Sequence, residues 1–299
     1  MASPPSLHIP IRTVSLPSRE HPILHKFDAV LNHLKTWQIL SESETAPFGA
    51  ESIQIGLVGL AELYNYVDEI ILTPHSQQAI FRYRSGKLVE DALDGSLTLL
   101  DTCSIAKEII VMIKQHVLTL QSAFRRRNSS IGSNIHTYIH SRKNVQKEIS
   151  ICLGALKKLE TKVGCFTFSD ADQPVMEVAR VIREASNITI SIFRSLLLFL
   201  SMPVMKTKVG WSLVSKLMPS RMSSSRKGQM VINEVKSLDL SLFYLSEHLG
   251  ANNSKDEMKK IQKMLETLNL SLDSLEAELE CMSRCLVQNR VSLLNILTQ

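Results

Sequence analysis

The chain has 299 residues, of which 44% are hydrophobic, 5% aromatic and 21% charged, and its formal net charge is +5. That length and apolar content suffice for a substantial buried core, which excludes a disordered chain, and the charge is too mild to indicate a nucleic-acid partner. The densest apolar run, residues 188–200, contains Arg194 and is too short to cross a bilayer.

The N-terminal residues are rich in proline and show little periodicity, which predicts an extended arm over residues 1–22. This arm contains Arg12 and Arg19 and no acid before Glu20, so a plastid transit peptide stays open as an alternative. The five scattered cysteines lack a CxxC spacing and indicate reduced thiols, so we expect an intracellular protein, most simply a cytoplasmic one.

After the arm, apolar residues recur at steps of three and four, the spacing that places them on one face of a helix. The predicted helices cover residues 23–40, 53–72, 77–81, 88–124, 134–163, 175–202, 204–218, 229–249 and 255–297, with a linker near 164–174. No segment shows a sustained alternation of apolar and polar residues, the pattern expected of a half-buried strand. The sequence therefore predicts an all-α protein, a long-helix bundle of about six to nine helices in a single domain over residues 23–299.

The last helix carries a heptad ladder, which we call the seam. Its members are Met258, Ile261, Leu265, Leu268, Leu272, Leu275, Leu279, Met282, Leu286 and Leu293, with a break at Asn289. Such a pattern fits an intermolecular coiled coil or the closing helix of an antiparallel bundle within the chain. We favour the second, because the chain holds other long amphipathic helices. The oligomeric state stays undetermined at this point.

Charge is unevenly distributed along the chain. No acid occurs between Glu108 and Glu148 or between Glu184 and Glu234, whereas residues 239–280 are rich in acids. The basic middle and the acidic end can neutralise each other within one fold. Otherwise the basic residues offer a surface for an acidic protein or an anionic membrane.

The candidate basic interaction surface consists of Arg125, Arg126, Arg127, Arg142, Lys143, Arg221, Arg226 and Lys227. The arginine triplet also has a structural explanation, because the exposed carbonyls at the C-terminal end of a helix favour cations. Arginines two and three positions before Ser129, and Arg221 before Ser224, predict two sites for a basophilic kinase.

No catalytic, cofactor or metal motif stands out. His136 and His140 have a zinc-like spacing, but Thr137 follows His136 where a metalloprotease has glutamate, and no third ligand is evident. We therefore predict no metal and no cofactor. The alternative is an enzyme of small-molecule signalling chemistry with an interhelical site, for which the acids to examine are Asp68, Asp94, Asp101 and Glu184.

Several short blocks together resemble a plant-specific family of unknown function, the BYPASS-related proteins. They are SLPSR at 15–19 with HP at 21–22, LY at 63–64 with VD at 67–68, LDGSL at 93–97 with LLDTC at 99–103, LQSAF at 120–124 with the arginine triplet, SRK at 141–143, SLL at 195–197, GW at 210–211 and RVSLLNIL at 290–297. LTPHSQ at 72–77 departs slightly from the family pattern.

This resemblance implies a helical plant protein without established enzymatic activity, linked to root and shoot development. It transfers no catalytic or ligand residue, and it makes the N-terminal block part of the mature domain, which weakens the transit-peptide alternative. We expect a non-enzymatic interaction or regulatory protein with protein partners, and peripheral contact with an anionic membrane as a further option.

Overall fold

The computed structural model describes residues 22–42, 49–82, 87–126, 130–164, 173–202, 233–247 and 255–298. Over these residues the protein has eight helices and no strand, which confirms the predicted all-α class. The helices are α1 (Pro22–Glu42), α2 (Ala50–Ile71), α3 (Pro74–Arg82), α4 (Lys87–Arg126), α5 (Ile131–Gly164), α6 (Gln173–Leu200), α8 (Glu234–Glu247) and α9 (Lys255–Thr298).

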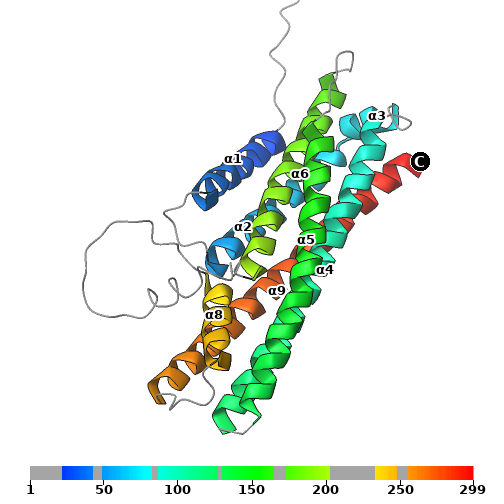
Figure 1. Cartoon of the computed structure of the whole chain (residues 1–299). Coiled ribbons are helices and arrows are strands. Elements are labelled where there is room, and N and C mark those ends of the chain that lie inside the picture. Colours follow the sequence, from blue (N-terminus) through cyan, green and yellow to red (C-terminus); the bar gives the residue numbers. More distant parts are fainter. Residues whose placement is uncertain are drawn as a thin grey trace, which may run out of the picture.

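Three long helices give the molecule its elongated shape (Figure 1). α4 and α5 form an antiparallel hairpin, in which Ser141 lies beside Met112 and Leu159 lies beside Gly95. α4 has 40 residues and is about 60 Å long at 1.5 Å per residue. α9 runs antiparallel to α4 and in the same direction as α2, so it is packed on two sides along its length.

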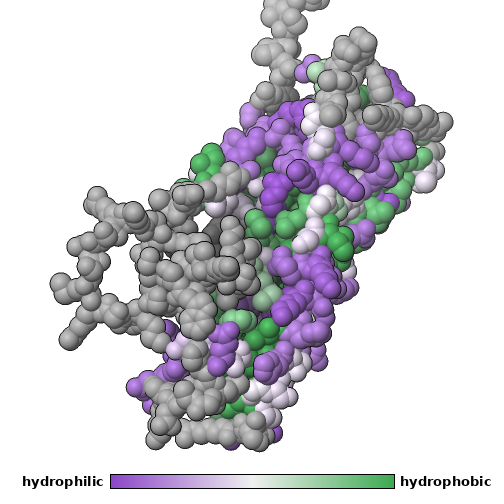
Figure 2. Space-filling view, in the orientation of Figure 1, coloured by the Kyte–Doolittle hydropathy of each residue, from purple (hydrophilic) through white to green (hydrophobic). Residues whose placement is uncertain are grey.

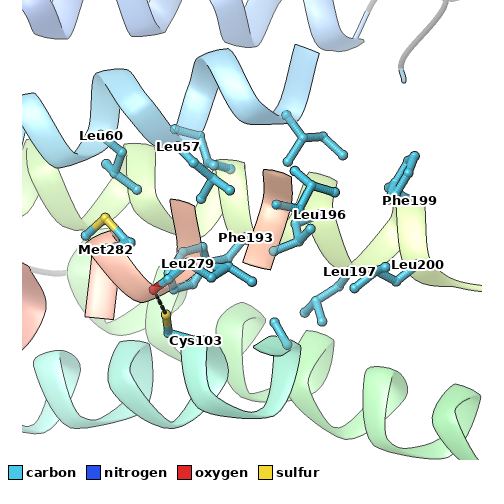
Figure 3. Packing of buried hydrophobic residues seen from close by; sticks show 14 of the residues in the cluster. Leu57, Leu60, Cys103, Phe193, Leu196, Leu197, Phe199, Leu200, Leu279 and Met282 are labelled. Carbon is cyan, nitrogen blue, oxygen red and sulfur yellow. Dashed lines mark hydrogen bonds between the residues drawn. The ribbon is translucent and has the colours of Figure 1, made fainter. Parts of the chain in front are cut away.

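The seam of α9 is buried within the chain itself. Nine of its ten members lie in the hydrophobic core, and Met258 packs against that core. Residues of all eight helices contribute to the same cluster, for example Leu57 and Leu60 of α2 with Phe193 and Leu196 of α6 (Figure 3). The structure therefore agrees with the seam as the closing surface of an intramolecular bundle.

The break in the seam has a specific partner. Asn289 is buried, and its side-chain amide donates hydrogen bonds to the carbonyls of Tyr64 on α2, at 3.0 Å, and of Cys285, at 3.1 Å. Its Oδ1 atom is buried without a hydrogen-bond partner, so the alignment rests on the two bonds that the amide nitrogen donates. A buried polar side chain bonded to a neighbouring helix favours one alignment of the two helices over others. Asn289 thus fixes how far along α2 the last helix lies.

α1 and α2 approach each other closely at Gly56. A Cβ atom at this position would lie 2.9 Å from the ring of Trp37 on α1. The Trp37 indole nitrogen also donates a 2.7 Å hydrogen bond to the Ser52 carbonyl. Glycine is therefore required at residue 56 for the indole to lie against the backbone of α2.

Some sequence predictions fall outside the described residues. These are the extended arm up to residue 21, the helix over 204–218, and the interior of the linker, although α5 ends at Gly164 and α6 begins at Gln173 as the linker predicted. α9 ends one residue after the predicted boundary of 297. Within the part that the structure describes, no helix is both long and apolar enough to cross a membrane.

The buried seam generates a stability prediction. Replacing Leu272, which is fully buried, with alanine should lower the free energy of unfolding by about 2–5 kcal/mol, because it removes apolar contacts and leaves a cavity. The matched change Leu270→Ala, two residues away on the same helix at 70% exposure, should alter it by less than about 0.5 kcal/mol. Urea unfolding followed by circular dichroism measures both. Equal losses would mean that the seam does not face the core.

Candidate functional site

The structure separates the predicted basic residues into three groups. Arg125, Arg126 and Lys143 are exposed on α4 and α5, as an interaction surface requires. Arg142 is only 1% exposed, so the prediction that it belongs to this surface is wrong. The remaining predicted positions, Arg127, Ser129, Arg221, Ser224, Arg226 and Lys227, lie outside the described residues.

Arg142 instead forms a buried cluster with Asp239 of α8 and Tyr138 of α5. Its Nη2 atom donates a 2.8 Å hydrogen bond to Oδ2 of Asp239, and its Nε atom donates one of 3.1 Å to Oδ1. The Tyr138 hydroxyl donates to the same Oδ1 atom at 2.7 Å. A two-point contact of this kind is geometrically specific, so it seats α8 in one position on α5.

The protonation states in this cluster suit a structural role. Burial alone would lower the pKa of Arg142, but the charge and hydrogen bonds of Asp239 raise it overall. Burial, followed by the negative charge of Asp239, raises the pKa of Tyr138 well above its ordinary value, so the phenol stays protonated. The adjoining hollow of about 10 Å³ has no room for a ligand larger than water.

A row of ion pairs joins α4 to α9. Lys107 pairs with Glu280, the Nζ atom of Lys114 lies 2.5 Å from Asp273 and 2.8 Å from Glu276, and Arg125 lies 3.3 Å from Glu266. The acidic end of the sequence therefore neutralises part of the basic middle within the fold. Arg126 and Lys143 have no such pair among the described residues, so their charge remains available.

Arg126 borders an open hollow of about 480 Å³ where α4 ends and α5 begins; we call it the tip groove. It is lined by Gln115, Leu118, Thr119, Ser122, Ala123 and Arg126 of α4, together with Ser130 and Asn134. Most of these side chains donate or accept hydrogen bonds, and one is cationic. The first turn of α5 also presents backbone N–H groups at this end of the hairpin, which favour negative charge.

The acids considered for an enzyme do not converge. Asp94 and Asp101 are exposed on α4, and Glu184 of α6 pairs with Lys35 of α1 at 2.7 Å. Asp68 on α2 has a buried oxygen without a hydrogen-bond partner. His136 and His140 are exposed on α5, and no group of three potential metal ligands occurs in the described part of the chain.

Sequence reasoning overlooked Asp239 and the polar residues of the tip groove. One signal could have found the buried cluster: Tyr138, Arg142, Val145 and Ile149 continue the three-four spacing of the core face of α5. Arg142 was assigned to the surface from its charge alone, whereas its position in the period places it inside. The tip groove had no comparable signal, because it combines two helix ends.

Comparison with known proteins gives one family. The family model described as BPS1, Protein BPS1, matches residues 56–296, a span that contains the tip groove, the buried cluster and the seam. No curated protein and no solved structure matches the chain.

The buried cluster predicts a large effect of removing one charge. Asp239→Ala should lower the free energy of unfolding by about 3–5 kcal/mol, because it leaves the Arg142 guanidinium buried without its counter-ion. Replacing both residues, as Arg142→Met with Asp239→Leu, should recover part of that loss, because no charge is then buried alone, while the Tyr138 hydroxyl still lacks its acceptor. Urea denaturation of the three proteins measures the differences.

The exposed pair between Arg125 and Glu266 supplies the control for that experiment. Arg125→Ala should change the free energy of unfolding by no more than about 1 kcal/mol, since solvent screens this contact. A loss of the same small size for Asp239→Ala would contradict a structural role for the buried cluster.

Proposed function

The chain belongs to the BPS1 family, and from that membership we propose that it is a non-enzymatic interaction protein of plant cells that binds an acidic segment of a partner protein at the tip groove. The link to root and shoot development, which the family resemblance implies, is part of this proposal. So is an intracellular, most simply cytoplasmic, location. The observation that carries the proposal is the position of Arg126, unpaired among the described residues, beside a hollow lined by hydrogen-bonding side chains.

The tip groove suits a peptide better than a small substrate. It is open, and its donors and acceptors are spread over two helix ends rather than converging on one point. An extended acidic segment can place a carboxylate against Arg126 while its backbone bonds to side chains such as Gln115 and Asn134. None of the described residues that line the groove is an acid, so none of these side chains repels an anionic ligand.

An anionic membrane is the competing partner for the same charges. Membrane-surface helices combine cations with a broad apolar face that enters the lipid. Among the described residues that line the tip groove, Leu118 is the one large hydrophobic side chain, and it is 46% exposed. Hydrogen bonding with a protein segment therefore accounts for the lining better than lipid insertion does.

Peptide binding tests the proposed function. A fluorescent peptide of glutamate and serine, together with its phosphoserine form, should bind the full chain, and Arg126→Glu should weaken binding by about tenfold through loss of a charge-assisted contact. Fluorescence anisotropy measures the affinity. Lys157→Glu, an exposed charge reversal toward the other end of α5, should leave it unchanged.

Two results would reject this function. The first is failure of the unaltered chain to bind either acidic peptide. The second is equal loss of binding in Arg126→Glu and Lys157→Glu, which would indicate general charge attraction. Binding to phosphatidylserine vesicles that depends on Arg126, without peptide binding, would assign the groove to the membrane instead.

A further inference from the structure

The outward face of α4 carries acids interspersed with large apolar side chains. Asp94, Asp101 and Glu108 recur every seven residues and are exposed, with no ion pair among the described residues. Leu97 lies between the first two acids at 48% exposure, and Val111 follows Glu108 at 43% exposure. Seven-residue spacing keeps these positions on one stripe of the helix, so the stripe is both acidic and partly apolar.

The outward face of α5 carries the opposite charge. His136, His140, Lys143 and Lys147 follow one another at steps of four, three and four, and all four are exposed. The next position of this stripe is Ile151, which is 72% exposed. None of the four bases forms an ion pair with a described residue. Figure 2 shows hydrophilic and hydrophobic side chains intermingled over this part of the surface.

The two stripes lie at different heights along the hairpin. Gly95 is level with Leu159, and Met112 is level with Ser141. The acids of α4 therefore lie beside the part of α5 that follows residue 145, whereas the bases of α5 lie mostly beside the part of α4 that follows residue 106. Lys158, which is exposed and continues the α5 stripe seven residues after Ile151, lies among the acids. This face of the hairpin thus has a mainly acidic end and a basic end, with apolar side chains among them.

We propose that this face binds a second copy of the chain across a two-fold axis. In such an interface each surface meets its own counterpart, so a face with separated acidic and basic ends can satisfy both at once. The acids of one copy contact the bases of the other, and this happens twice. Leu97, Val111 and Ile151 lose contact with water in this interface.

The partner is a second copy because one chain supplies both halves of the complementary surface, and neither half is paired within the described residues. An unrelated partner would explain the basic stripe or the acidic stripe, but not their presence together on one face. The dimer face goes beyond the proposed function, since Arg126 is not among its acids or bases. The two surfaces adjoin, because Gln115 of the tip groove continues the seven-residue spacing of Asp101 and Glu108.

Two charge-reversal variants test the dimer. The first is Asp101→Lys with Glu108→Lys, and the second is Lys143→Glu with Lys147→Glu. Analytical ultracentrifugation over a wide range of protein concentration should show a dimer for the unaltered chain that weakens with added salt. Each variant alone should associate at least about tenfold more weakly, because like charges then face each other.

Mixing the two variants provides the decisive measurement. A one-to-one mixture should form a heterodimer about as readily as the unaltered chain, since every reversed stripe then meets its complement. Lys157→Glu with Lys162→Glu, a matched change of two exposed residues on α5, should leave dimerisation unchanged. Circular dichroism checks that each variant is folded.

Three outcomes would overturn the proposal: a monomer at every concentration, dimers of the two variants as tight as that of the unaltered chain, or a mixture that stays monomeric. The peptide assay on Asp101→Lys with Glu108→Lys reports on the tip groove separately, so loss of the dimer and loss of peptide binding are distinguishable.

Discussion

The fold depends on burying α9 along most of its 44 residues. Its seam is almost uniform in leucine, and a uniform seam could slide by one turn with little change in apolar contact. A few polar contacts prevent this. Asn289 binds the Tyr64 carbonyl, the Cys103 thiol lies 3.5 Å from the Leu279 carbonyl, and Lys114 reaches two acids one turn apart. Leucine supplies the stability of the bundle, and these contacts supply its alignment.

The same alignment decides which charges remain on the exterior. By lying antiparallel to α4, the last helix uses its acids on Lys107, Lys114 and Arg125. Arg126 and the exposed bases of α5 are left without an ion pair among the described residues, and so are the outward-pointing acids of α4. The charges of the tip groove and of the two outward stripes are thus those that the ion pairs between α4 and α9 do not use. The packing of α9 on α4 therefore determines which charged side chains a partner can meet.

Sequence periodicity predicted the helices and the burial of the seam, because both depend on residues close together in the chain. It did not predict the burial of Arg142, because the period of α5 indicates a buried position whereas the charge of the side chain indicates an exposed one. Its partner Asp239 also lies 97 positions away in the sequence. The ion pairs of α4 and α9 were foreseen only as general compensation, because pairing residues requires knowing which helices are neighbours. The tip groove, built from two helix ends, had no linear signature.

The buried cluster that joins α5 to α8 also has a consequence for the order in which the helices can pack during synthesis. α8 has 14 residues, too few for a stable helix in water on its own, and it carries the only carboxylate that the structure places on the Arg142 guanidinium. At about 5–20 residues per second, the ribosome needs roughly 5–20 s to reach Asp239 after Arg142. Throughout that interval the nascent α5 must keep its arginine hydrated, so the α5 surface that will receive α8 stays open to water, and to chaperones, until the later helix emerges.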